Sequence, residues 1–253
     1  MAQAVQTIPE QFQPIPVRIG ATWPSAVAFA VRRFADLQLG TIWAFLRPKL
    51  SRLHGSLLDV GCGEMPYRGY LPADLSYTGI DVPQAPAFAM RGSEAVVPFD
   101  GVSIPFADCS FDTVLCTEVI EHAAEPEALI AEMLRVLKSG GTVIATVPFS
   151  ARVHYAPHDY RRFTKYALER LFAGFCRVRI EERGNDIAVI ANKLIVLALR
   201  MIPPSPWSLL RWPLLVLVLP LGLTFLLVAH LTLFLDLGSK HDPLGYSIVA
   251  EKR

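Results

Sequence analysis

The chain has 253 residues and a formal net charge of +1, from 24 lysines and arginines against 23 aspartates and glutamates. This length allows one large α/β domain with an extra segment, or two small domains. The near-zero charge argues against a nucleic-acid partner, which usually requires a strongly basic surface. The cysteines stand singly, so no C-x-x-C pair indicates a zinc site or a disulfide framework, and a reducing, cytoplasmic setting fits best. They are Cys62, Cys109, Cys116 and Cys176.

The N-terminal part of the chain divides into two segments. Residues 1–24 are polar and rich in proline, and we expect them to be irregular. They lack the basic and apolar regions of a signal peptide. Apolar residues recur with helical spacing over residues 25–53, with Gly40 and Pro48 as interruptions. We therefore expect a helical cap over residues 25–55.

Residues 56–185 alternate short β-type runs with helical patterns, which is typical of βαβ units in a parallel sheet. The clearest helix is predicted over Pro126–Leu137, with Ser139-Gly140-Gly141 ending it. We expect residues 56–185 and 243–253 to form one domain. The predicted strands are Ser56–Val60, Tyr77–Asp81, Ala95–Phe99, Phe111–Cys116, Gly141–Val147, Arg177–Glu182 and Gly245–Glu251.

A glycine turn follows the first predicted strand, in the run Leu57–Glu64 (LLDVGCGE). Glycines in such a turn let the backbone take positive φ or approach a ligand closely. A dinucleotide site would carry a third glycine where this chain has Pro66, which argues against NAD or FAD. About 20 residues further on, the second strand ends in Asp81, where a carboxylate can bind both ribose hydroxyls.

Further motifs follow in order: Asp100 before Ile104-Pro105-Phe106, then Ser110-Phe111-Asp112, Glu121-His122, and the run 135–141 (RVLKSGG). The set resembles the class I S-adenosylmethionine-dependent methyltransferases, in particular the small-molecule, methyltransferase type 11-like branch. The resemblance covers about residues 56–165 and, through the last strand, 245–251. It implies a Rossmann-like, doubly wound, seven-stranded sheet that is mostly parallel, with an antiparallel last strand.

The resemblance also implies S-adenosylmethionine as the cofactor and assigns residues to it. The turn after the first strand would line the amino-acid end, Asp81 the ribose and Asp100 the adenine amino group, with Thr117 and Glu118 beneath the sulfonium. Methyl transfer needs proximity, alignment and a dry site, so we expect neither a metal nor a covalent nucleophile. The predicted cofactor-binding residues are Asp59, Gly61, Cys62, Gly63, Asp81, Val82, Asp100, Thr117 and Glu118.

Candidates for acceptor chemistry are His122, after the fourth strand, and His158 and Tyr160, in the loop after the fifth. Such groups could remove a proton from a hydroxyl acceptor. The run 158–164 (HDYRRFT) also resembles an H-D-Y-x-R-F-T element of some family members. The alternatives are structural: His122 packs at a helix start, Thr164 caps a helix over 165–172, and Arg162 pairs with a carboxylate. Tyr67 could likewise contact the cofactor or only pack.

Residues 186–242 form an apolar insertion. Trp212–Leu235 holds no charged residue over about 24 positions, the length of a membrane span. Ile187–Ile202 is shorter and carries Lys193 and Arg200, which suits a membrane interface. In the resembled fold the last strand lies in the same sheet as the others, so the chain must return to that sheet after the insertion, which excludes a single span.

Three arrangements of the insertion remain open. They are a two-span hairpin, a shallow hairpin broken near residues 220–222, and a buried helical subdomain or homodimer contact. Trp207 and Trp212, near Arg211, resemble interfacial anchors. We expect attachment through residues 186–237 at the cytoplasmic side of a membrane.

The sequence thus predicts methyl transfer to a small acceptor, hydrophobic or lipid-linked, at a membrane surface. One alternative is a catalytically silent, Rossmann-like membrane protein that binds a nucleotide or a partner. The other is an NAD-dependent oxidoreductase, which Pro66 opposes.

Overall fold

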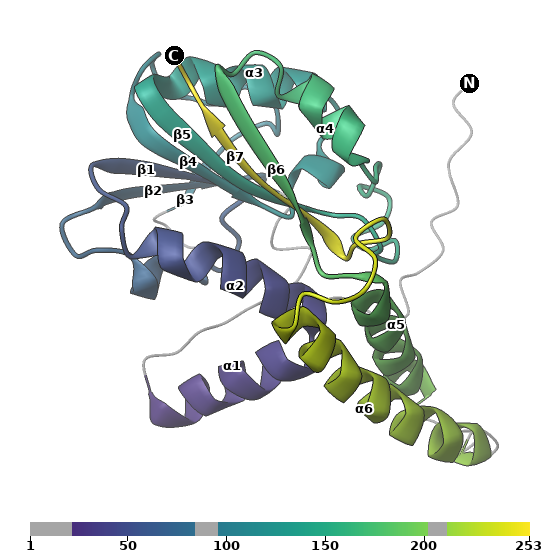
Figure 1. Ribbon diagram of the computed structural model, residues 1–253. Helices are drawn as coiled ribbons and strands as arrows, with labels where there is room; N and C mark the ends of the chain where they lie inside the picture. Colours follow the sequence, from purple (N-terminus) through teal and green to yellow (C-terminus); the bar gives the residue numbers. More distant parts are fainter. Residues whose placement is uncertain (1–21, 84–95, 202–211) are drawn as a thin grey trace.

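A computed structural model of the protein describes residues 22–83, 96–201 and 212–253 (Figure 1). Within them lies a seven-stranded sheet with the order β3-β2-β1-β4-β5-β7-β6. β7 is antiparallel to both of its neighbours, and the other paired strands are parallel. The predicted fold class is therefore confirmed. The strands are β1 Ser56–Val60, β2 Ser76–Asp81, β3 Val96–Pro98, β4 Phe111–Thr117, β5 Leu137–Pro148, β6 Arg177–Arg183 and β7 Gly245–Glu251.

All seven predicted strands are present, and their sequences explain their places in the sheet. The central strands β1 and β4 are mostly apolar, and most of their residues are buried, as expected for parallel strands covered by helices. The edge strand β6 instead alternates charged and apolar residues. The predicted strand over 95–99 corresponds to β3, although Ala95 lies outside the described residues.

Helices cover both faces of the sheet (Figure 1). On one face, α3 (Pro126–Val136) and α4 (Lys165–Leu171) bury Met133 and Leu168 against the sheet. On the other, α2 (Leu37–Leu50) buries Leu46 and Leu50. Each fully buried leucine stabilises the fold by about 1.5–3 kcal/mol. Between β1 and β2 the chain forms only the short 3-10 helix η1 (Arg68–Tyr70), so α2 and the turns after β1 cover this part of the sheet.

Two predicted interruptions are wrong in position. The N-terminal helices α1 (Trp23–Ala35) and α2 break at Asp36, whose Oδ1 accepts a hydrogen bond from the Leu39 amide. Gly40 and Pro48 lie inside α2. A Cβ at Gly40 would lie 2.6 Å from the carbonyl oxygen of Arg33, so this glycine permits a close crossing of the two helices rather than ending one.

The end of α3 also differs from the prediction. The helix stops at Val136, and the chain enters β5 directly at Leu137. The run Ser139-Gly140-Gly141 therefore lies within β5 and not at a helix end. Gly140 has φ +76°, and the pairing of β4 with β5 shifts register at this point. The glycines thus accommodate an irregular start to the strand.

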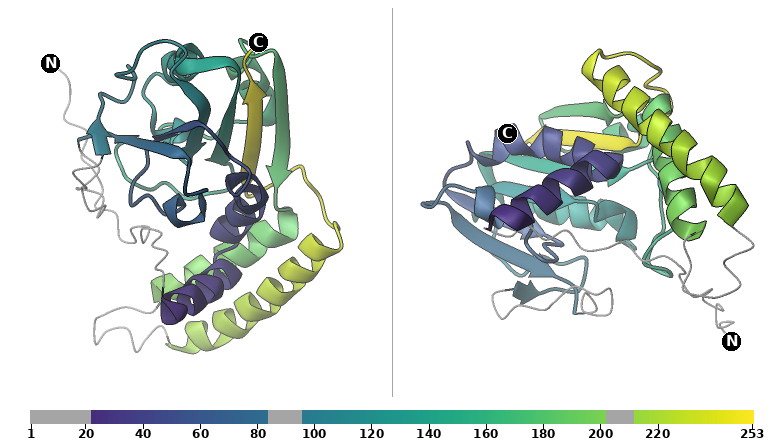
Figure 2. Two further views of the ribbon diagram at one scale, coloured as in Figure 1. Left: turned by 90° about the vertical axis from the view of Figure 1, so that its left-hand side faces the viewer. Right: turned by 90° about the horizontal axis from the view of Figure 1, so that it is seen from below.

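The apolar insertion forms two helices that lie side by side (Figure 2), α5 (Asp186–Met201) and α6 (Trp212–Phe234). α6 continues through Pro220, so the break near residues 220–222 required by the shallow-hairpin arrangement is absent. Gly222 faces α5, and a Cβ there would lie 3.4 Å from Ile195 Cδ1. Trp207 and Arg211 lie outside the described residues.

Most of α6 is not covered by the rest of the protein. Among the described residues it is the one helix long and apolar enough to cross a membrane, with a mean hydropathy of 2.5 and 28% burial in its most apolar window. A buried helical subdomain is therefore wrong for this segment. α1 lies beside α6, where His230 stacks on Phe34 at 4.3 Å. We call the exposed side chains of both helices the apolar surface: Trp23, Val27, Val31, Phe34, Leu214, Val216, Leu217, Leu227, Leu231 and Phe234.

The helices and strands agree in chain order with the four predicted segments. α1 and α2 occupy the N-terminal cap, and α5 and α6 lie in the insertion before β7. The division into residues 1–24, 25–55, 56–185 with 243–253, and 186–242 stays a prediction.

Candidate active site

The glycine turn after β1 lies against the ends of β2 and β4. Gly61 and Gly63 have φ values of +67° and +51°, in the left-handed region that favours glycine. A Cβ at Gly61 would lie 2.4 Å from Val119 Cγ2, so only glycine fits beside the residues that follow β4. Cys62 is buried, with its sulfur beneath Gly79. The turn therefore offers backbone to a ligand, while its cysteine faces the interior.

Asp81 connects the end of β2 to the glycine turn. Its two carboxylate oxygens accept hydrogen bonds from the amides of Gly63 and Val82, each at 2.8 Å. Burial raises the pKa of Asp81, and the two amide bonds oppose this rise. A carboxylate has about four acceptor positions, so Asp81 retains capacity for ribose hydroxyls. Its placement beside the turn suits the predicted role.

Asp59 has a different environment. Its side chain is buried in β1, and its Oδ2 accepts a hydrogen bond from the Tyr77 hydroxyl at 2.7 Å. Burial raises the pKa of Asp59 to about 7, while the bond from Tyr77 lowers it and the nearby Asp81 raises it further. The structure thus gives Asp59 an internal partner that the sequence did not suggest. A direct contact with the cofactor stays a prediction.

Asp100 is exposed in the loop after β3. Its Oδ1 accepts hydrogen bonds from the amides of Val102 and Ser103, which lower the pKa of its carboxyl group. β3 pairs with β2, with Pro98 opposite Asp81, so the Asp100 loop follows the neighbouring strand end. This placement suits contact with an adenine next to a ribose at Asp81.

Thr117 and Glu118 end β4 and begin the loop that packs on Gly61. Glu118 has φ +55°, and its amide donates to the carbonyl of Thr146 at 2.9 Å. Tyr67 belongs to the segment that follows the glycine turn. Because Tyr67 is buried, this residue packs between the two loops, and its pKa is raised by burial.

Sequence reasoning missed Arg183, the buried last residue of β6. Its guanidinium donates to Glu118 Oε1 at 2.8 Å, to Thr41 Oγ1 in α2 and to the carbonyl of Val147. Burial lowers the pKa of Arg183, and the charge of Glu118 raises it. Arg183 is one of several charged residues in β6, and nothing in that strand's sequence separates a buried arginine from exposed ones.

The three candidate proton acceptors lie near one another but in different surroundings. His122 ends the 3-10 helix η3 (Ile120–His122), and its Nδ1 lies 2.8 Å from the carbonyl oxygen of His158. Burial lowers the pKa of His122 to about 4. The side chains of His158 and Tyr160 are exposed, with His158 Nδ1 3.2 Å from the tyrosine hydroxyl. The His122 ring therefore meets the backbone of His158 and not its imidazole.

Most polar side chains of residues 158–164 form hydrogen bonds within the protein. Asp159 is buried and binds both terminal nitrogens of Arg162, which confirms the predicted arginine–carboxylate pair. Arg161 donates to the carbonyls of Ala123 and Ala124, just after η3. Thr164 caps α4 by accepting a hydrogen bond from the Ala167 amide. The run thus positions the segment around His122.

The predicted cofactor residues therefore form one group at the carboxyl ends of β1, β2 and β4, where open α/β sheets bind ligands. Asp81 is hydrogen-bonded to the amides of Gly63 and Val82, and Gly61 packs against Val119, the neighbour of Glu118. Asp59 and Cys62 face inward. Only the short 3-10 helix η1 lies between the glycine turn and β2, so the backbone amides of the turn itself would meet the ligand. These assignments stay predictions.

Comparisons with known proteins agree with this geometry. Residues 58–145 match the family model described as a methyltransferase domain. An uncharacterised methyltransferase of Mycobacterium leprae (strain Br4923) is 35% identical over 142 residues, which cover 52% of this chain and 48% of that protein. Ajmaline N-methyltransferase of Rauvolfia serpentina is 34% identical over 104 residues, covering 35% of this chain and 34% of that one. The chain spans about half the length of the first of these relatives, and less of the second.

Solved structures with the same fold are more distant in sequence. A methyltransferase from Archaeoglobus fulgidus, described as dependent on S-adenosylmethionine, has a TM-score of 0.51 at 16% identity, covering 89% of this chain and 99% of that one. The [4+2]-cyclase SpnF has a TM-score of 0.52 at 23% identity, covering 85% and 81%. The cyclase shows that this fold carries more than one reaction.

Residues 58–145 are thus similar to a methyltransferase domain, and the methyltransferase relatives and the seven-stranded fold agree with this match. This match supports S-adenosylmethionine as the cofactor.

Proposed function

We propose that the protein transfers the methyl group of S-adenosylmethionine to a small hydrophobic or lipid-linked acceptor at a membrane surface. One observation carries the proposal. The helix pair α5 and α6 leaves the sheet and returns to it at the edge that also holds the candidate active site. The acceptor would reach the methyl donor from the membrane that these helices contact.

The register of the strands supports this placement. β4, β5 and β6 run in the same direction and end at Thr117, Pro148 and Arg183. Both Pro148 and Arg183 pair with Gly245 at the start of β7. α5 begins at Asp186, immediately beyond the end of β6, and α6 returns the chain toward β7. The helix pair is therefore anchored where ligands bind in open α/β sheets.

The apolar surface supports attachment to a membrane. α6 has 23 residues and rises about 35 Å, against a hydrocarbon core of about 30 Å. Large exposed apolar patches mark membrane or protein contacts. Lys193 and Arg200 are exposed on α5, where they would reach the headgroup region. We propose that α5 and α6 enter the membrane as paired helices, with the exposed face of α1 on the interface.

An open groove of about 750 Å³ beside these helices suits an acceptor with polar and apolar parts. Phe34, Leu37 and Leu233 contribute an apolar wall, and Lys49 and Arg183 contribute charge. Arg183 also binds Glu118, so one residue joins the groove to the candidate cofactor site. The groove would hold the apolar part of the acceptor close to the sheet.

His122, His158 and Tyr160 remain the proposed groups for accepting a proton from a hydroxyl acceptor. His158 and Tyr160 are exposed, so solvent or an acceptor can reach them. The methylated atom is left open by this proposal.

Two measurements test the function. Calorimetry with S-adenosylmethionine should show saturable binding by the purified protein. Extracts of cells with and without the protein, compared by mass, should then show a lipid or small molecule heavier by one CH2 group. A folded protein that binds no S-adenosylmethionine would favour the silent binding protein instead. Membrane fractionation after deletion of residues 207–235 tests the location, and an unchanged membrane fraction would contradict attachment through α6.

A further inference from the structure

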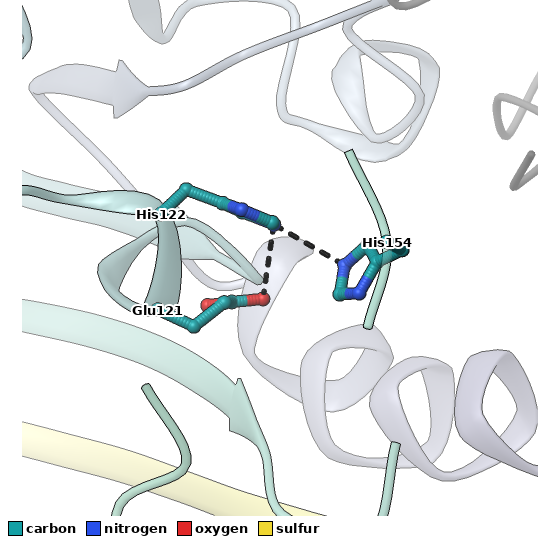
Figure 3. A group of neighbouring side chains, drawn as sticks. All are labelled: Glu121, His122 and His154. Carbon is teal, nitrogen blue, oxygen red and sulfur yellow. Dashed lines mark hydrogen bonds and ion pairs between the residues drawn. The ribbon is translucent and has the colours of Figure 1, made fainter. Parts of the chain in front are cut away.

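Three side chains with metal-ligating atoms meet beside the candidate active site (Figure 3). Glu121 and His122 come from η3, and His154 comes from the loop after β5. One ligand atom of each lies within 4.8 Å of the other two. Glu121 is buried, and the side chains of His122 and His154 are 18% and 14% exposed. The group thus has an interior side and a side that solvent can reach.

Hydrogen bonds fix the same tautomer for both imidazoles. His122 Nδ1 lies 2.8 Å from the carbonyl oxygen of His158, which can only accept, so this nitrogen carries the proton. His154 Nδ1 lies 3.1 Å from the carbonyl oxygen of Arg152 and 3.2 Å from Asp159 Oδ2, so it also donates. Each neutral ring therefore presents the lone pair of its Nε2 to the group.

The two Nε2 atoms face each other at 3.2 Å. With both rings neutral, neither Nε2 can donate to the other, so the contact is favourable only with a proton or a metal ion between the two nitrogens. Two nitrogens bound at about 2.0 Å to a tetrahedral ion lie about 3.3 Å apart, which agrees with the observed spacing.

Glu121 supplies an independent observation. Both of its carboxylate oxygens are buried and have no hydrogen-bond partner among the described residues. Its Oε1 lies 3.6 Å from His122 Nε2, so the carboxylate points toward the imidazoles (Figure 3). A buried carboxylate without a partner is costly unless it is neutral or meets a cation. Arg162 is bound by Asp159 on both terminal nitrogens, and no hydrogen bond joins its remaining Nε to Glu121.

We propose that Glu121, His122 and His154 bind a divalent first-row transition-metal ion, such as Zn²⁺ or Fe²⁺. Two imidazoles and one carboxylate are a common ligand set for these ions, and they leave positions open for water or an acceptor oxygen. The carbonyl of His158 and the carboxylate of Asp159 are the outer partners that orient the ligating rings. The sequence predicted no metal site, so this proposal departs from that expectation.

The proposal changes the role of His122. Its Nε2 would be a metal ligand and not a free proton acceptor. Glu121 follows closely on Glu118, which is predicted to lie beneath the sulfonium. The ion would therefore lie near the predicted methyl donor. Metal binding itself does not depend on methyl transfer, so the two can be tested separately.

The test uses the full chain after removal of metals with a chelator. Zn²⁺ and Co²⁺ are titrated by calorimetry, and bound metal is counted after dialysis. We expect one ion per chain, and Co²⁺ absorption bands typical of nitrogen and oxygen ligands. Glu121→Gln and His154→Ala should each weaken binding at least 10-fold, while His54→Ala and His241→Ala, at exposed histidines outside the group, should bind as the unchanged protein does.

Circular dichroism establishes that each variant is folded before its affinity is compared. Absence of saturable binding by the folded protein would overturn the proposal. So would a folded His154→Ala variant that binds Zn²⁺ as tightly as the unchanged protein. Because the measurement follows the metal alone, loss of S-adenosylmethionine binding would leave this result intact and would contradict only the proposed function.

Discussion

Arg183, at the end of β6, donates a hydrogen bond of 2.8 Å to the carboxylate of Glu118, the residue that follows β4. The same guanidinium contacts Thr41 in α2 and the carbonyls of Val147 and Tyr246. One buried side chain thus joins the helical cap, three strand ends and the candidate cofactor site. The position of Glu118 depends on this arginine.

We expect Glu118→Ala to lower the free energy of unfolding by about 3 kcal/mol, because it leaves the buried charge of Arg183 without its carboxylate partner. Urea unfolding measures the change. Glu181→Ala is the matched control, since Glu181 pairs with Arg179 on the surface, where their side chains are 49% and 76% exposed, respectively. That pair should contribute less than about 1 kcal/mol. Equal losses in both variants would contradict the role of Arg183.

Gly61→Ala should abolish measurable binding of S-adenosylmethionine and destabilise the fold. The added Cβ meets Val119 Cγ2, and a left-handed φ alone costs about 1–2 kcal/mol for a residue with a side chain. Calorimetry and thermal unfolding measure the two effects. Gly69→Ala is the control, because a Cβ there meets nothing within 4 Å.

The double variant Gly61→Ala with Val119→Ala separates the two causes. Removing the valine methyl groups relieves the collision but leaves the strained φ. We therefore expect partial recovery of stability. Full retention of cofactor binding by the single variant would show that the turn does not approach the ligand.

Asp59 should make the protein less stable as the pH rises from about 4 to about 7. Burial raises the pKa of its carboxyl group from 3.8 to about 7, so the folded state holds a proton that the unfolded chain has released. The stabilisation is complete below the unfolded pKa and is lost as the pH rises through the folded pKa. A shift of this size corresponds to about 4 kcal/mol.

Asp59→Asn removes this dependence, because its amide stays neutral and still accepts from Tyr77. Urea unfolding from pH 4 to pH 8 should show a flatter profile for the variant, which exceeds the unchanged protein in stability at pH 8. Asp112→Asn is the opposite control: Lys138 lowers the pKa of Asp112 to about 2, so its stabilisation is lost as the pH falls. Parallel profiles for Asp59→Asn and the unchanged protein would refute the raised pKa.

Leu217→Glu combined with Leu227→Glu should release the protein from anionic lipid vesicles. Both side chains are exposed on α6, at 66% and 62%, so the charges do not disturb the core. Each carboxylate would have to leave water to enter the lipid, at a cost of several kcal/mol. Co-sedimentation measures the bound fraction, and we expect at least a 10-fold fall.

Tyr166→Glu is the control for the vesicle experiment. Tyr166 is 76% exposed on α4, on the other side of the sheet from α1. It should bind vesicles as the unchanged protein does. Undiminished binding by the α6 variant would show that α6 does not contact the membrane.

The local pattern of the sequence determined much of this protein. Alternation of short apolar runs with helical periodicity predicted all seven strands, and the order of LDVGCG, Asp81 and Asp100 predicted the class of domain. These features depend on neighbours along the chain. Gly40 was misjudged for the same reason: its sequence suggests a break, whereas its function is to admit Arg33 of another helix.

Only the tertiary structure decided which polar groups meet. Arg183 and Glu118 are far apart in sequence, and so are His122 and His154, and only the packing of separate strand ends brings each pair together. Whether a carboxylate faces solvent or the interior also depends on distant residues, as Tyr77 does for Asp59 and as burial does for Glu121. A sequence pattern carries the period of a strand or helix, but burial and charge pairing are properties of contacts that form only when the chain folds.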